Sequence, residues 1–250
     1  MAAAISRSFL SDLDPLAPFR SAAAKWAFQS EAQAEGGEAR PVLATRWAEL
    51  DAVLPDHGFV HGATELAAPF AHGGGSSIAM ASIASLHAAS SASGRAWAAW
   101  VDPEGSLYAP ALAEAGVDLS HLLVVRPPPN EARQVAVKLA ASAAFAVVVV
   151  DHFAAASVGR GVHKADELFV RKLSLQPCVS LLLTDQHAPR TGSLPTVLRL
   201  ELSRRPDAIT VRVAKDRMGR AGAVKTVPLR TRPSLTASSS SPSASLIVAA

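Results

Sequence analysis

The stretch AFAVVVVD, residues Ala144–Asp151, decides the fold class of this 250-residue chain. Seven apolar residues follow one another without polar alternation, which is typical of a strand buried on both faces of a parallel sheet. Comparable apolar runs recur along the chain, separated by segments of helical periodicity: Arg95–Asp102, Leu122–Pro127 and Cys178–Gln186. Strands that alternate with helices in this way predict an α/β fold, with a mostly parallel twisted sheet flanked by helices.

The pattern changes near the C-terminus. TVLRLELSRRPDAITVRVAKDR, residues Thr196–Arg217, alternates apolar and polar residues around a turn, which predicts antiparallel strands. We expect a core domain over residues 44–230, preceded by an arm over residues 1–40 that holds one helix, Ala22–Ala34. The serine-rich residues 231–250 are predicted to form a disordered tail, whose apolar end LIVAA either frays or docks on the core.

Composition and charge exclude several classes of protein. A formal net charge of +3 is compatible with nucleic-acid binding but is far from that of a dedicated basic protein. We expect DNA binding to be weak or indirect. The single cysteine, Cys178, excludes an internal disulfide, and the histidines lack paired-ligand spacing, so no metal site is expected. The N-terminus lacks a signal-peptide pattern, and the most apolar run, Leu139–Val150, is too short to span a bilayer. We expect a cytoplasmic protein without membrane contact.

A glycine-rich stretch, TELAAPFAHGGGSSIAM (Thr64–Met80), lies where a nucleotide-binding protein has its phosphate loop. Such a loop reads G-x-x-x-x-G-K-[ST], and its lysine supplies the main point charge on the phosphates. No lysine or arginine lies between Arg46 and Arg95, and the backbone N–H groups and helix dipole that remain attract an anion only modestly. Ser76 or Ser77 is the expected N-cap of the following helix. The remnant of a nucleotide loop comprises Gly73, Gly74, Gly75, Ser76 and Ser77.

Acidic residues follow two of the predicted strands. Asp151 ends one strand, and Asp102 and Glu104 follow another. Because the carboxyl ends of parallel strands share one edge, these carboxylates should project into the same crevice. There Asp151 could hold a magnesium ion and Glu104 could activate a water molecule. The alternative interpretation is the ordinary polarity of turns and helix caps.

Three further polar residues end later strands. Gln186 could sense a phosphate or cap a turn. Lys215 and Arg217 could act in trans on the phosphates of a neighbouring subunit, or could form an ordinary solvated face.

The order of these segments resembles the core of the RecA/Rad51 recombinases from about Thr45 to Leu229. The resemblance implies a RecA-like fold with Asp151 as the magnesium-site aspartate and Glu104 as the catalytic glutamate. It also implies roles for three more residues, namely nucleotide-to-DNA-loop coupling by Gln186 and contact with the adjoining subunit's nucleotide by Lys215 and Arg217. The chain departs from this family in three ways: Ala68 replaces the first glycine of the loop, the lysine is missing, and the segments matching the two DNA-binding loops are short.

A RecA-like core without the lysine and the long DNA loops resembles the ImuA family of accessory proteins in bacterial translesion mutagenesis. This resemblance implies a non-catalytic scaffold of SOS-induced DNA synthesis that needs no cofactor, with Glu104, Asp102 and Asp151 as vestiges of a catalytic site. The implied partners are ImuB and an error-prone C-family DNA polymerase, with RecA as a further candidate. Trp26 and Phe28, on the predicted helix of the arm, are candidate partner-binding residues, unless that helix folds back on its own core.

Two other functions stay open at this point. The first is an ATPase of the RecA/KaiC/RadA type that binds ATP and Mg²⁺ with an unusual loop and takes its positive charge from Lys215 or Arg217 of a neighbour. The second is a cell-division inhibitor with a trimmed RecA-like core.

Overall fold

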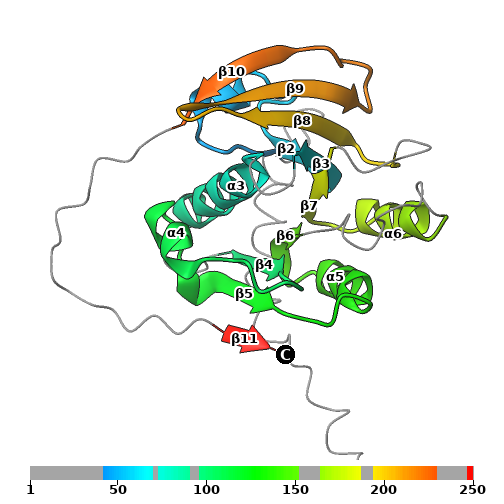
Figure 1. The fold of residues 1–250 in the computed structure, drawn as a ribbon. Coiled ribbons are helices and arrows are strands. Elements are labelled where there is room, and N and C mark those ends of the chain that lie inside the picture. The colour runs from blue at the N-terminus through cyan, green and yellow to red at the C-terminus, as the bar shows by residue number, and fades with distance from the viewer. Residues whose placement is uncertain are drawn as a thin grey trace, which may run out of the picture.

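The computed structural model describes residues 42–69, 73–90, 96–151, 164–186, 194–229 and 247–249. These residues form an α/β architecture in which one large sheet is covered by helices on both faces (Figure 1). A separate pair of two-residue strands, β1 (Val42–Leu43) and β2 (Phe59–Val60), pairs antiparallel beside it.

The large sheet has nine strands in the order β10-β9-β8-β3-β7-β6-β4-β5-β11. Only β9 runs against its neighbours, because it pairs antiparallel with both β8 and β10 while every other neighbouring pair is parallel. The mostly parallel sheet with antiparallel strands near the C-terminus is therefore confirmed. The strands are β3 (Gly62–Ala68), β4 (Trp97–Val101), β5 (Leu122–Val125), β6 (Phe145–Val150), β7 (Val179–Asp185), β8 (Leu198–Arg204), β9 (Ala208–Asp216), β10 (Val224–Pro228) and β11 (Ile247–Ala249).

Helices cover both faces of the sheet, which explains why the residues of its inner strands β4 and β6 are all apolar. Trp100 and Val149 face one cluster of buried side chains, which Ile83 of the long helix α3 completes. Val148 faces the opposite cluster, where it is joined by Phe169 of α6. Because successive side chains point to opposite faces, a strand buried on both sides cannot alternate with polar residues. The helices are α2 (Ala48–Asp51), α3 (Gly75–Ala89), α4 (Ala109–Glu114), the 3₁₀-helix η2 (Leu119–His121), α5 (Ala132–Ala141) and α6 (Lys164–Ser174).

The two ends of the chain are described only in small part. The predicted arm helix, Ala22–Ala34, lies outside the described residues, and the proposed domain boundaries stay predictions. Ile247–Ala249 forms β11 and pairs with β5, so these three residues differ from the predicted disordered tail and follow its docking alternative. Among the described residues, no helix is both long and apolar enough to cross a membrane.

Candidate functional site

The carboxyl ends of the parallel strands form one edge of the sheet, which we call the carboxyl edge. The glycine-rich turn lies there after β3, and the backbone N–H of Gln186 donates to the carbonyl of Ala68 at 2.9 Å, which ties β7 to the end of β3. The backbone N–H of Asp151 donates to the carbonyl of Val101 at 3.0 Å, so the acids that follow β6 and β4 are neighbours at the same edge. The glycine turn, the acids and Gln186 therefore all lie at the carboxyl edge of the sheet.

The glycine turn is packed closely against its own protein. A Cβ atom on Gly73 would lie 1.8 Å from the Cβ of Ala68, and one on Gly74 would lie 2.5 Å from Cδ1 of Ile209. Gly74 has φ +83° and is the N-cap of α3, so the expectation of a serine cap is wrong. A left-handed backbone favours glycine at this cap. Because the cap is Gly74, the exposed Ser76 lies in the first turn of the helix. The glycines thus serve a tight strand-to-helix connection.

Gly74→Ala is expected to lower the free energy of unfolding by about 2 kcal/mol, since it combines a left-handed φ with overpacking against the fully buried Ile209. The matched control is Gly219→Ala, where φ is +79° but no heavy atom lies within 4 Å of the added Cβ, so only the backbone strain of about 1 kcal/mol applies. Urea unfolding followed by tryptophan fluorescence measures both changes. Equal losses in the two variants would contradict the packing argument.

Asp102 is fully buried and holds the loop that follows β4. Its carboxylate accepts hydrogen bonds from the backbone N–H groups of Ser106 at 3.0 Å and Leu107 at 3.2 Å. Nε of Arg126 donates to the same carboxylate at 3.4 Å. Asp102 therefore stabilises a loop, as a buried carboxylate with this many donors does.

The other two acids have different surroundings. Asp151 is almost fully buried, and one of its carboxylate oxygens accepts a hydrogen bond from the indole Nε1 of Trp100 at 3.3 Å. Glu104, by contrast, is exposed in the turn after β4. The predicted pair Asp102 and Glu104 is thus divided between the interior and the surface.

Charge at the carboxyl edge does not favour phosphate. Four acids end or follow strands there, Asp102, Glu104, Asp151 and Asp185, and Arg126 is ion-paired with Asp102. The first turns of α5 and α6 add the cations Arg133 and Lys164, of which Arg133 is ion-paired with Asp166. Phosphate groups brought to this edge would meet more negative than positive charge from the described side chains, which is unfavourable at short range.

Lys215 and Arg217 lie at the opposite edge of the sheet, since β9 runs antiparallel and its Asp216 stands beside Leu198 at the start of β8. Nζ of Lys215 donates to the carbonyl of Leu194 at 2.6 Å. Burial lowers the pKa of Lys215, and the charge of Arg199 adds to this effect while Glu65 opposes it. Within one chain, neither cation reaches the glycine turn.

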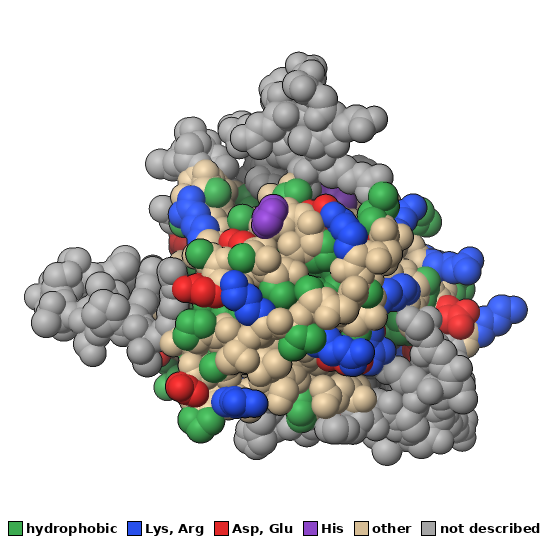
Figure 2. All heavy atoms as spheres, turned by 90° about the horizontal axis from the view of Figure 1, so that it is seen from above, with side chains coloured by type: hydrophobic (Ala, Val, Ile, Leu, Met, Phe, Trp, Pro, Cys, Tyr) green, Lys and Arg blue, Asp and Glu red, His purple; other side chains and the backbone are tan. Residues whose placement is uncertain are grey.

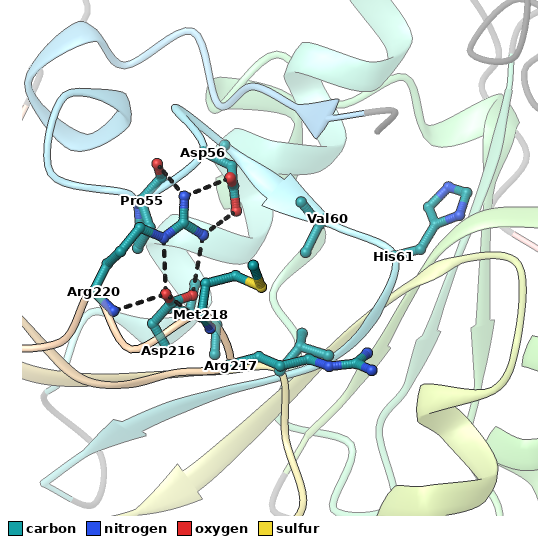
Figure 3. A pocket seen from close by; sticks show the side chains of 11 residues that line it. Pro55, Asp56, Val60, His61, Asp216, Arg217, Met218 and Arg220 are labelled. Atoms are coloured by element: carbon teal, nitrogen blue, oxygen red, sulfur yellow. Dashed lines mark hydrogen bonds and ion pairs between the residues drawn. The ribbon is translucent and has the colours of Figure 1, made fainter. Parts of the chain in front are cut away.

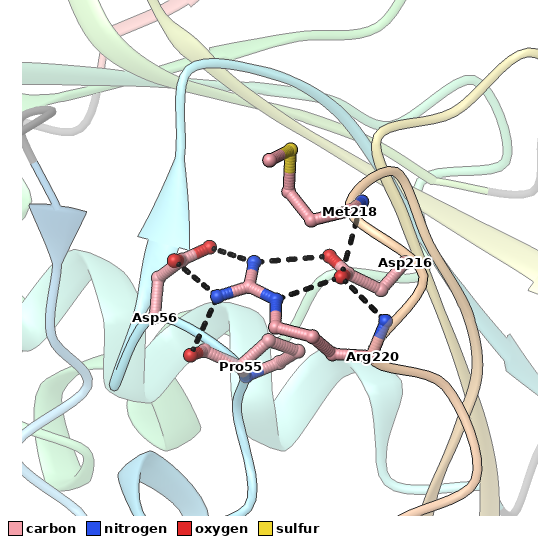
Figure 4. Close-up of polar contacts among 5 residues, drawn as sticks. All are labelled: Pro55, Asp56, Asp216, Met218 and Arg220. Atoms are coloured by element: carbon pink, nitrogen blue, oxygen red, sulfur yellow. Dashed lines mark hydrogen bonds and ion pairs between the residues drawn. The ribbon is translucent and has the colours of Figure 1, made fainter.

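A pocket of about 240 Å³ opens at that opposite edge, between the turn before β2 and the turn after β9 (Figure 3). His61 and Arg217 line one side of it, and burial lowers the pKa of His61. On the other side, the guanidinium of Arg220 binds Asp56 at 2.8 and 2.9 Å and Asp216 at 2.9 Å (Figure 4). Arg220 thus clamps the two turns together, which no sequence pattern indicates.

This clamp predicts a dependence on pH. Burial raises the pKa of Asp216, but the hydrogen bonds and charge of Arg220 outweigh it, so that the pKa lies below its ordinary value of 3.8. The stabilisation is complete above the unfolded-state pKa and is lost as the pH falls through the lower folded-state pKa. Arg220→Ala should therefore flatten the acid limb of a plot of unfolding free energy against pH below about pH 4. An acid limb identical to that of the parent chain would contradict this account.

A buried ionic cluster stands in the middle of the sheet, where the sequence suggests no site. Glu65 on β3 is fully buried, and Oγ1 of Thr184 donates to its carboxylate at 2.8 Å. Arg199 on β8 lies 3.7 Å from the same carboxylate and 3.5 Å from Glu201, which in turn binds Arg212 at 2.9 Å. The signal that could have found it is a lone glutamate in the otherwise uncharged strand GATELAA.

Surface charge is mixed on the face that carries β8 to β10. Figure 2 shows the lysine and arginine side chains of the described residues scattered among hydrophobic and acidic ones, without a continuous basic strip on this face. Trp26 and Phe28 lie outside the described residues, and the part of the chain that the structure describes holds no group of three metal-ligating side chains.

Neither a comparison with models of protein families nor one with curated proteins gives a match.

Proposed function

We propose that this chain is a RecA-like accessory protein of damage-induced translesion DNA synthesis, which acts through protein contacts and does not hydrolyse nucleotide. The observation that carries the non-catalytic part is the glycine turn. It has no lysine, and a Cβ atom on Gly73 would lie 1.8 Å from the Cβ of Ala68 and one on Gly74 would lie 2.5 Å from Cδ1 of Ile209, so both glycines pack tightly against their own protein. A loop used in this way joins a strand to a helix without offering a charge to phosphate.

The acids at the carboxyl edge support the same proposal. Asp102 is saturated by loop N–H groups and Arg126, and Asp151 binds an indole N–H. These contacts give Asp102 and Asp151 a structural role that does not require a magnesium ion.

The assignment to translesion synthesis rests on the resemblance to ImuA, with ImuB, an error-prone C-family DNA polymerase and RecA as proposed partners. Purified full chain should retain at least one of these proteins from the same organism in a pull-down, and a chain lacking residues 1–40 tests whether Trp26 and Phe28 form the contact. Failure of all three partners to bind would refute the assignment. Unchanged binding by the shortened chain would show only that residues 1–40 do not form the contact.

We expect no ATP hydrolysis above background at any protein concentration, because the site lacks the cation that neutralises the phosphates. Phosphate release with ATP and Mg²⁺ measures this, with Glu104→Gln as the matched variant, since that residue is exposed and its substitution should leave folding intact. Turnover that Glu104→Gln abolishes would refute the proposal.

The second candidate is an ATPase with a cation supplied by a neighbouring subunit. It is favoured by the gathering of Asp102, Glu104 and Asp151 at the edge that holds the glycine turn. Turnover that rises steeply with protein concentration and disappears in Arg217→Ala would support it. The bond from Lys215 to the carbonyl of Leu194 argues against that lysine as the donor.

A further inference from the structure

The two sides of the large sheet, where its outermost strands could pair with a further strand, are protected in different ways. The edge strand β10 carries Lys225 and Pro228, and its residues are mostly exposed. Lysine and proline are ordinary means of preventing another strand from pairing with an edge. The strand β5, near the other edge, reads LLVV and carries no charge, glycine or proline.

An uncharged apolar strand such as β5 would invite pairing by any extended segment if its outer side were open. In this molecule β11 occupies that side, with Ile247 opposite Leu123, Val248 opposite Val124 and Ala249 opposite Val125, all in parallel register. The C-terminal segment therefore provides the protection that the sequence of β5 lacks.

We propose that the outer edge of β5 is a strand-accepting interaction site, that its occupant is the C-terminal segment of the same molecule, and that this segment blocks strand addition by another chain. The partner that fits the site is an extended, uncharged, β-branched peptide that pairs in parallel. A strand of that kind gains main-chain hydrogen bonds along the edge and places alternate side chains over the sheet.

The length of the chain allows the segment to come from the same molecule. Strand β10 ends at the carboxyl edge, whereas β11 must begin at the other end of the strands, where the parallel strands start. The two strands also lie eight strand spacings apart across the sheet. Spacings of about 4.8 Å, combined with one strand length, give a path of roughly 45 Å. The seventeen residues 230–246 can extend to about 60 Å, which exceeds the path and leaves room for a detour.

The same length decides between the molecule's own tail and that of a second copy. A tethered segment has an effective concentration on the order of millimolar when its linker can span the sites. A second copy at micromolar concentration presents its tail at a concentration roughly a thousand times lower, so the molecule's own tail occupies the site.

The first test is a disulfide trap. The register places Val125 beside Ala249, and neighbouring strands bring Cα atoms within the range that a disulfide needs. Cys178 is the only natural cysteine, and burial raises its pKa to about 11, so it does not compete. Under mild oxidation the variant Val125→Cys with Ala249→Cys should form an intramolecular disulfide at least about ten times more readily than Val224→Cys with Ala249→Cys, whose partner lies on β10. Equal yields, or a product linked between two chains, would overturn the intramolecular assignment.

The second test removes residues 246–250. Amide hydrogen exchange in β5 should accelerate by about tenfold or more, while exchange in β6 and β7 stays unchanged, at a dilution where light scattering reports monomers. A peptide with the sequence of residues 245–250, SLIVAA, should bind the shortened chain at least about ten times more tightly than the full chain, whose own segment occupies the site. Unchanged exchange in β5, or equal binding of the peptide by the two chains, would overturn the proposal.

Discussion

Glu65→Ala is expected to lower the free energy of unfolding by about 3–5 kcal/mol, the range for removing one partner of a buried ion pair. Glu65 is fully buried, and the side chain of Arg199 beside it is only 17% exposed. Arg199 stands directly opposite Lys215 across β8 and β9. Without the carboxylate, two cations would face each other with little access to water, since like charges opposite one another in a sheet repel.

The matched control is Glu201→Ala, which removes a carboxylate from the same ladder of charges but at a position that is 31% exposed. We expect it to cost at most about 1 kcal/mol, as exposed ion pairs do. The double variant Glu65→Met with Arg199→Met should recover most of the loss, because apolar replacement of a whole buried pair is often neutral. Urea unfolding measures all three variants, and additive losses in the double variant would contradict the interpretation of Glu65 as a neutralising charge.

Much of the large sheet could be predicted from the sequence because burial on both faces leaves a simple pattern. The residues that form β4, β5 and β6 are all apolar, those that form β7 are apolar except at Ser180, Thr184 and Asp185, and each strand ends within two residues of the predicted position. The alternation over Thr196–Arg217 likewise became the antiparallel pair of β8 and β9.

Strands without such a pattern were not predicted. In β10 only Val227 is buried, so its sequence does not differ from that of an exposed loop. The strand β1 has only two residues, which is too short for any periodicity. β11 follows a serine-rich stretch, and its place beside β5 depends on a partner strand more than a hundred residues away.

The candidate site could be predicted in position but not in detail. Parallel topology by itself brings the glycine turn, Asp102, Asp151 and Gln186 to one edge. The contacts that decide their roles are set by register and loop conformation, which a single sequence does not reveal. The cluster around Glu65 is the clearest case, because Arg199 and Lys215 reach it only through the pairing of β3, β8 and β9.

Asp102→Ala is expected to lower the free energy of unfolding by about 3 kcal/mol, since hydrogen bonds to a charged acceptor contribute about 1.5–3 kcal/mol each and the substitution removes several of them. The side chain of Arg126 is 41% exposed and can be solvated, so its lost partner adds little. The loss should come mainly from the N–H groups of Ser106 and Leu107, whose loop would lose its fixed conformation.

Glu104→Ala is the matched control for this prediction, because Glu104 lies two residues away, was predicted to act with Asp102, and is exposed. Its effect on unfolding should stay within about 0.5 kcal/mol. A catalytic pair would behave in the opposite way, since both variants would lose activity and neither would need to lose stability. Urea unfolding and phosphate release, measured on both variants, separate these cases. A stable Asp102→Ala chain whose ATP turnover is lower than that of the parent would show that Asp102 acts on a nucleotide, whereas a destabilised chain with no turnover to lose would place Asp102 in the architecture of the loop.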